Sequence, residues 1–175
     1  MKYKLKSFIK SEDIKITFNY ADNKNVLFEW KHIRNPLRTF FNMLIVKLSS
    51  SLDLKTKIFL FRYLLNVSIG KNVGVSPGVK LDYFYPNLIS MEDNVIIGWQ
   101  VNILCHEFTH NYVRIGRVIL RDNCTIGAFS TIRSGVVVGK NSVVAMCSFV
   151  NKDIPPGEVW GGVPAKFISK VEQSS

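Results

Sequence analysis

Residues 118–153 read VILRDNCTIGAFSTIRSGVVVGKNSVVAMCSFVNKD and repeat one pattern every six residues. One position of each repeat is always aliphatic, and the position two residues before it is always valine, cysteine or serine. A period of six fits neither an α-helix nor an ordinary two-faced strand. It is typical of a parallel β-helix, in which short strands meet at corners and each strand sends the same two side chains inward. The aliphatic series is Leu120, Ile126, Ile132, Val138, Val144 and Val150, and the series before it is Val118, Cys124, Ser130, Val136, Ser142 and Ser148.

The same pattern extends upstream to Ile69 with an interruption. The step from Leu81 to Met91 is ten residues, six plus four, so we expect a small loop at about 83–87. The Tyr-Phe-Tyr-Pro sequence of this loop is aromatic enough to form the lip of a substrate site, or alternatively to pack on a neighbouring element.

A second interruption separates Ile103 from Leu120, which lie seventeen residues apart, one short of three hexads. It contains CHEFTHNYVRIGR, residues 105–117, where we expect the chemistry. The aliphatic-Gly-x-x-x-x repeats, the segment VNKDIPPGEVWGGVPAKFI and the histidine ahead of a break resemble the hexapeptide-repeat acyltransferases, in particular the sugar and xenobiotic O-acetyltransferase branch. The resemblance covers about residues 67–168. It implies a left-handed β-helix, acetyl-CoA as acyl donor and a homotrimer.

A hydroxyl acceptor needs a base to take its proton, and histidine is the usual one. His106 stands where the regular coil ends, the place at which the family keeps its catalytic histidine; His110 is the alternative. Glu107 or a backbone carbonyl is expected to orient the imidazole. A nucleophilic Cys105 is disfavoured, because adjacent residues of an extended strand point to opposite faces. Acceptor-binding residues are expected at Tyr83, Trp99, Gln100 and Asn102.

A metal site is also disfavoured. His106 and His110 look like part of the three-histidine zinc set of β-helical carbonic anhydrases. Catalytic zinc needs three protein ligands, and the third would have to be the distant His32. We therefore expect no metal.

The donor site is implied by the resemblance alone. In the family, acetyl-CoA lies in a groove between neighbouring subunits, on backbone groups of the last coils and on basic residues near the C-terminal end. Three features depart from the family pattern. Thr125 stands where a tryptophan is usual, Ala145-Met146-Cys147 stands where the family has a small Gly-Ala-Gly corner, and Ser169, beside Lys170, stands where a basic residue is common. Matched by motif, the expected contacts are Gly127, Ala128, Ala145, Met146, Asn151, Lys152, Pro164 and Lys166.

Composition indicates one intracellular domain. The chain has 175 residues, of which 47% are hydrophobic, and no run of about 18 apolar residues that would span a membrane. The N-terminus has charges scattered through it and no apolar stretch before a cleavage site, unlike a signal peptide. Three cysteines, an odd number, favour a reducing cytoplasm.

The basic charge is concentrated in residues 1–66, which hold +8 of the net +10. Such a segment suits an anionic membrane surface, a phosphate-bearing substrate or nucleic acid, or is simply a solvated lysine-rich surface. Nucleic acid is least favoured, because no binding motif or basic stripe with interleaved aromatic residues is present.

Residues 14–31 predict a β-hairpin around a polar turn at 22–25, with His32 as a solvated turn residue. Asn35-Pro36 predicts the start of a helix, and a second helix is expected at about 52–65. Segment 34–65 either packs on the open end of the β-helix or lies on a membrane surface. The apolar stripe of the first helix is Leu37, Phe40, Phe41, Leu44, Ile45 and Leu48.

The sequence thus predicts an N-terminal hairpin and helical cap over 1–66, a left-handed β-helix over 67–168 and a tail over 169–175. We expect a cytoplasmic enzyme, at the inner face of the membrane if the helices bind lipid. It would move acetyl from acetyl-CoA to a hydroxyl of a sugar, in surface polysaccharide biosynthesis. The alternatives are N-acylation of an amino sugar, a different acyl group, or a non-catalytic β-helical scaffold.

Overall fold

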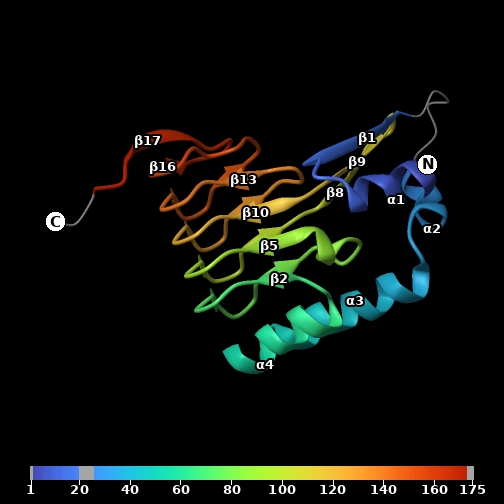
Figure 1. Ribbon diagram of the computed structural model, residues 1–175, viewed down its shortest axis with the longest axis horizontal. Coiled ribbons are helices and arrows are strands. Elements are labelled where there is room, and N and C mark those ends of the chain that lie inside the picture. Colours follow the sequence, from blue (N-terminus) through green and yellow to red (C-terminus); the bar gives the residue numbers. More distant parts are fainter. Residues whose placement is uncertain (1, 20–25, 173–175) are drawn as a thin grey trace.

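The computed structural model describes residues 2–19 and 26–172, and its body is a parallel β-helix of four coils (Figure 1). Three parallel sheets form its faces, and their strands follow one another coil by coil in the order that the hexads predict. The coils consist of β2 (Ser68–Ile69), β3 (Gly74–Val75) and β4 (Lys80–Leu81); β5 (Ile89–Met91), β6 (Ile96–Ile97) and β7 (Asn102–Ile103); β10 (Val118–Leu120), β11 (Thr125–Ile126) and β12 (Thr131–Ile132); and β13 (Val137–Val138), β14 (Val143–Val144) and β15 (Phe149–Val150).

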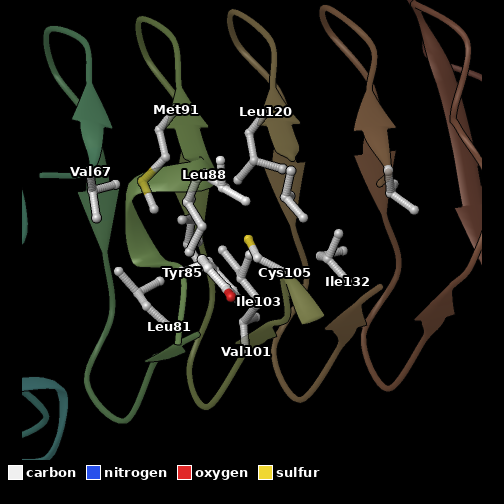
Figure 2. Packing of buried hydrophobic residues seen from close by; sticks show 14 of the residues in the cluster. Val67, Leu81, Tyr85, Leu88, Met91, Val101, Ile103, Cys105, Leu120 and Ile132 are labelled. Carbon is white, nitrogen blue, oxygen red and sulfur yellow. The ribbon is translucent and has the colours of Figure 1, made fainter. Parts of the chain in front are cut away.

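The predicted inward positions form the core. The aliphatic series from Leu120 to Val150 is at most 1% exposed, and the series from Val118 to Ser148 is at most 2% exposed. Equivalent residues of successive coils stack, since Leu81 pairs with Ile103 and Ile103 with Ile132 (Figure 2). The serines of the second series are satisfied locally: Ser130 and Ser148 both donate to the carbonyl of Ala145.

One corner of the coils is made by a ladder of asparagines. Asn72, Asn94, Asn123 and Asn141 all have positive φ, a conformation that asparagine tolerates better than most residues. Their side-chain amides are linked by hydrogen bonds of 2.9, 3.1 and 3.0 Å from coil to coil. The corner thus repeats the same turn four times and fixes the spacing of the coils.

The last coil is covered by a C-terminal hairpin. Strand β16 (Glu158–Gly161) continues a sheet of the β-helix, and β17 (Lys166–Lys170) pairs with it antiparallel. Residues 169 and 170 therefore belong to a strand rather than to the tail predicted from the sequence. Lys170 donates to Glu158 across this hairpin at 2.6 Å.

The first coil is covered by α4 (Leu54–Phe59) and the π-helical turn η2 (Leu60–Leu64). Phe61 and Leu65 are fully buried beneath them. Arg62 donates to the carbonyls of Ile69 and Gly70, and the ammonium of Lys57 lies 3.1 Å from the carbonyl of Ser76. These cations satisfy the backbone acceptors that an open end of a β-helix would expose.

Helix α3 (Pro36–Ser49) begins at the predicted cap, where the side chain of Asn35 accepts from the N–H groups of Leu37 and Arg38. Packing on the β-helix would be expected to bury the apolar stripe of this helix, but five of its six residues are exposed, and only Ile45 is buried. The helix buries a largely polar face, since it packs beside backbone groups such as the carbonyl of Tyr83, which accepts from Asn42 at 2.9 Å. The buried face consists of Thr39, Asn42, Ile45, Val46 and Ser49.

The N-terminal hairpin was also wrongly predicted. Strand β1 (Lys15–Asn19) forms, but residues 26–33 are the short helices η1 (Val26–Glu29) and α2 (Trp30–Ile33), so His32 is helical; the turn predicted at 22–25 lies outside the described residues. Tertiary packing overrides strand propensity here, because Trp30 meets Phe84 edge to face at 5.8 Å. A further helix, α1 (Lys2–Lys10), ends where Arg117 donates to its last carbonyls. Within the described residues, no helix is both long and apolar enough to cross a bilayer.

Candidate active site

The two interruptions of the coil meet at one place. The first is the loop after β4, which contains the short helix η3 (Pro86–Leu88). The second contains the hairpin of β8 (His106–Phe108) and β9 (Tyr112–Gly116), and β1 pairs with the other edge of β9. This three-stranded sheet lies beside the coils (Figure 1), and His106 is the first residue of its strand β8.

A buried carboxylate joins the two loops. Asp82 is 1% exposed. One of its oxygens accepts from the backbone N–H groups of Phe84 and Tyr85, both at 2.8 Å. The other accepts from the N–H groups of Cys105 at 2.7 Å and His106 at 3.1 Å, and lies 2.5 Å from Nδ1 of His106. All five hydrogen bonds use Asp82 as acceptor, so the loop conformation and the imidazole orientation depend on one side chain.

This contact sets the role of each ring nitrogen. An ionised carboxylate can only accept a hydrogen bond, so Nδ1 of His106 carries the proton in this pair. Nε2 is then the nitrogen left to accept a proton from another group. The sequence analysis placed Glu107 or a backbone carbonyl in this orienting position; the structure shows that Asp82 holds it instead.

Glu107 has a different set of partners. Arg133 donates to both of its oxygens, at 2.8 and 2.7 Å, Ser134 donates at 2.6 Å, and Arg114 lies 3.6 Å away. Burial alone would raise the pKa of Glu107, but the hydrogen bonds from Arg133 and Ser134 and the two arginine charges outweigh it and lower that pKa below its usual value. Glu107 therefore ties the β8–β9 hairpin to the corner after β12.

His106 lines a cavity of about 440 Å³ between α3 and the coils. Tyr83 and Asn102, two of the four predicted acceptor residues, also line it. The other two, Trp99 and Gln100, are not in its lining; Trp99 packs edge to face on Phe129 of the next coil at 5.0 Å. The full lining is Met43, Val46, Lys47, Ser50, Lys80, Leu81, Asp82, Tyr83, Asn102, Leu104 and His106.

Aromatic rings surround the imidazole. The centroid of Phe84 lies 4.3 Å from that of His106, and those of Phe108 and Tyr83 lie at 5.3 and 6.0 Å. Only 13% of the His106 side chain is exposed. The ring is thus held by packing as well as by Asp82, with one edge open to the cavity, which is the arrangement that a general base requires.

The other candidate groups are less suitably placed. His110 is exposed beyond the end of β8, at the turn of the hairpin. Cys105 is fully buried, and burial together with the nearby Asp82 carboxylate raises the pKa of its thiol well above the usual range, which disfavours a thiolate. Across residues 2–19 and 26–172, no three His, Cys, Asp or Glu side chains are grouped as metal ligands.

Comparison with known proteins identifies the family. A model of the bacterial transferase hexapeptide, with six repeats, matches residues 117–152. The chain is 38% identical over 117 residues to YvoF of Bacillus subtilis (strain 168), a protein assigned as an acetyltransferase. The match covers 67% of this chain and 68% of YvoF. The chain belongs to the hexapeptide-repeat acetyltransferases.

Two further proteins are similar to this acetyltransferase, one in sequence and one in fold. Galactoside O-acetyltransferase of Escherichia coli (strain K12) is 31% identical over 129 residues, 59% of this chain and 64% of that protein. In fold, the chain is similar to a hexapeptide-repeat acetyltransferase of Vibrio cholerae that was solved with acetyl coenzyme A. The two structures superpose with a TM-score of 0.66 at 23% sequence identity, over 88% of this chain and 94% of the Vibrio chain. The parallel β-helix predicted from the hexads is confirmed, and so is the left-handed form that the family resemblance implied.

The predicted donor residues of this acetyltransferase occupy three places. Gly127, Ala128, Ala145 and Met146 follow β11 and β14 at one corner of adjacent coils. The corner is tight, because a Cβ on Gly127 would lie 2.6 Å from the backbone nitrogen of Met146. Asn151 and Lys152 lie at the next corner, in a separate pocket that Lys15, Arg114 and Arg133 also line. Pro164 and Lys166 lie in the C-terminal hairpin.

Asp82 is the site residue that the sequence analysis missed, although a signal for it exists. Leu81 and Ile103 are paired neighbours in adjacent coils, so the residues after them begin side by side. An acidic residue directly after Leu81, at the start of the ten-residue step, is therefore placed beside the segment that leads to His106. Counting the coil register across the first interruption would have predicted the pair.

Proposed function

We propose that this protein transfers the acetyl group of acetyl-CoA to a hydroxyl of a sugar, in the biosynthesis of a surface polysaccharide in the cytoplasm. The observation that carries the proposal is the imidazole of His106, held at Nδ1 by the buried Asp82 carboxylate and opening on a 440 Å³ cavity. A hydroxyl is a weak nucleophile near neutral pH, and a base in this position removes its proton as it reacts.

The residues of this chain divide the work as follows. Nε2 of His106 takes the proton of the acceptor hydroxyl while the oxygen attacks the acetyl carbonyl carbon. Asp82 stabilises the imidazolium that forms, as a carboxylate does in a catalytic triad. Backbone N–H groups hold the developing oxyanion. His106 then returns the proton to the leaving sulfur, so the products are a sugar acetate and a free thiol.

Acetyl-CoA supplies an activated acyl group as a thioester. We assign its binding to a groove between subunits of a homotrimer, on the corner formed by Gly127, Ala128, Ala145 and Met146. The close approach of adjacent coils at Gly127 supports this, because only a residue without a Cβ fits against the backbone of Ala145 and Met146. Pro164 and Lys166 adjoin the groove, and Asn151 and Lys152, at the next corner, lie in a pocket with three further basic residues that suits phosphate groups.

The test is free-thiol release by the purified protein with acetyl-CoA and a panel of neutral, amino and acidic sugars. We expect release that depends on a sugar hydroxyl and is lost in His106→Ala but kept in His110→Ala. Release with amino sugars alone would replace the hydroxyl acceptor by an amine. No release with any acceptor, while the protein is folded, would leave the β-helix as a scaffold and refute the proposal.

A further inference from the structure

The outer face of α3 is an unusually apolar surface. Leu37 is 80% exposed, Phe40 62%, Leu44 42% and Leu48 57%. Their spacing of three or four residues places them on one side of the helix, roughly half a turn from the buried face that includes Asn42 and Ile45. Large apolar side chains gathered in this way on a surface usually mark a binding site.

The position of α3 makes this face point away from the rest of the molecule. Helices α3 and α4 run across the end of the β-helix at which β2 lies (Figure 1). The buried side of α3 faces the coils, and a third side, carrying Met43, Val46 and Lys47, lines the cavity at His106. The apolar stripe therefore lies on neither the side of α3 that packs against the coils nor the side that lines the cavity.

The charge around this face is one-sided. Between residues 30 and 65 the chain has seven Lys or Arg and a single acidic residue, Asp53. Asp53 is occupied as the cap of α4, where it accepts from two backbone N–H groups. Lys47 of α3 and Lys55 of α4 are exposed and in no ion pair within the described part of the chain. An apolar stripe flanked by exposed lysines is the composition of helices that lie in the interface of an anionic bilayer.

We propose that the exposed stripe of α3 docks this protein on a bilayer surface that contains anionic lipid. A second copy of the chain fits this face less well, because it would bring two basic surfaces together. In a trimer whose subunits stand side by side around the coil axis, all three stripes face the same way. Three copies then bind the bilayer together, which multiplies a weak individual contact.

Docking gives the active-site cavity a defined position, and this step rests on the proposed function. The cavity opens beside α3, and Lys47 and Lys80 line it; its only acidic residue, Asp82, accepts five hydrogen bonds. A sugar joined to a membrane lipid through a phosphate would reach His106 from the bilayer and place that phosphate near the lysines. The acceptor class that follows is a lipid-linked sugar.

The experiment measures co-sedimentation of the full chain with vesicles of phosphatidylcholine, with and without phosphatidylglycerol, in the absence of acetyl-CoA and acceptor. We expect binding only to the anionic vesicles, weakening as salt is raised, because the lysines act through screened charge. The double variant Phe40→Ser, Leu44→Ser should bind at least roughly tenfold less, since each side chain contributes apolar area to the contact.

The matched control is Phe167→Ser, Ile168→Ser on β17, at the far end of the molecule (Figure 1), where the side chains are 51% and 58% exposed. It should bind vesicles like the wild type. Equal loss in both variants, or no binding by the wild type, overturns the proposal. So does a Phe40→Ser, Leu44→Ser protein that falls apart into monomers, which assigns the stripe to a subunit interface. Because vesicle binding is measured without turnover, its failure leaves the acetyltransferase assignment untouched.

Discussion

Replacing Asp82 by Asn keeps the shape of the side chain, removes its charge and turns one of its two accepting oxygens into a donor. Whichever way the new amide is turned, its NH₂ group faces either the N–H groups of Phe84 and Tyr85 or those of Cys105 and His106. At least two buried donors lose their acceptor. Each such loss costs about 1–3 kcal/mol, so we expect the free energy of unfolding to fall by about 2–6 kcal/mol. For a chain of this size the melting temperature would fall on the order of 10 °C.

The same substitution should slow catalysis more than it weakens binding. Without the carboxylate, no negative charge stabilises the protonated form of His106, and an amide turned with its NH₂ toward the ring would place the imidazole proton on Nε2 instead of Nδ1. Loss of such support costs on the order of a thousandfold in kcat. The KM for acetyl-CoA should stay near that of the wild type, because the proposed donor groove contains no residue that Asp82 contacts.

The assay is thiol release under saturating donor, combined with thermal melting to show that the variant is folded at the assay temperature. The control is Asp93→Asn at the asparagine corner, where the Asp93 carboxylate accepts from the backbone N–H of Lys71 and lies outside the candidate site. That variant should keep its kcat. If the kcat of Asp82→Asn stays within about threefold of the wild type, the loss is far smaller than expected for a base that depends on this carboxylate. Asp82 would then have no positioning role.

Four other predictions concern the base, the hairpin and the assembly. His106→Ala should lower kcat at least about a hundredfold and His110→Ala should not; the reverse result would move the base to the hairpin turn. The pKa of Glu107 is lowered by folding, so the wild type should have a larger free energy of unfolding than Glu107→Gln. This difference should be constant above about pH 5 and shrink as the pH falls through the pKa of the folded state. A difference that persists in acid contradicts the pairing with Arg133. Sedimentation should find a homotrimer, and a concentration-independent, active monomer would refute it. Deleting residues 1–66 should give aggregated protein, because it uncovers the first coil and removes β1 from β9; a soluble, active fragment would show that this segment is dispensable.

The hexads were predictable because their signal is local and repeated. Each aliphatic residue of the series from Leu120 to Val150 must fit inside the β-helix against the coils next to it. The same steric requirement recurs every six residues. The helix cap at Asn35 was predictable for the same reason, since it depends on adjacent backbone groups.

The errors lie where distant contacts decide. Nothing near Trp30 in sequence indicates that it will pack against Phe84, and that contact turns an expected strand into helices. The apolar stripe of α3 was expected to be buried if the helix packed on the coils. The surface that α3 contacts is instead partly polar, as the hydrogen bond from Asn42 to the carbonyl of Tyr83 shows. At the site, His106 was identified by its place in the interrupted coil. Its partner Asp82 lies in the preceding coil, and the pairing can be predicted only by counting the coil register across the intervening loop.

The central claim is that His106, held by Asp82, deprotonates a sugar hydroxyl for acetyl transfer. The most direct test incubates wild-type protein and His106→Ala with acetyl-CoA labelled in the acetyl group and one acceptor from the panel, and locates the label in the product by NMR. The account predicts an O-acetyl ester at a single sugar position, formed by the wild type and lost in the variant. An ester formed at the same rate by His106→Ala, or label found only as an amide, would contradict it.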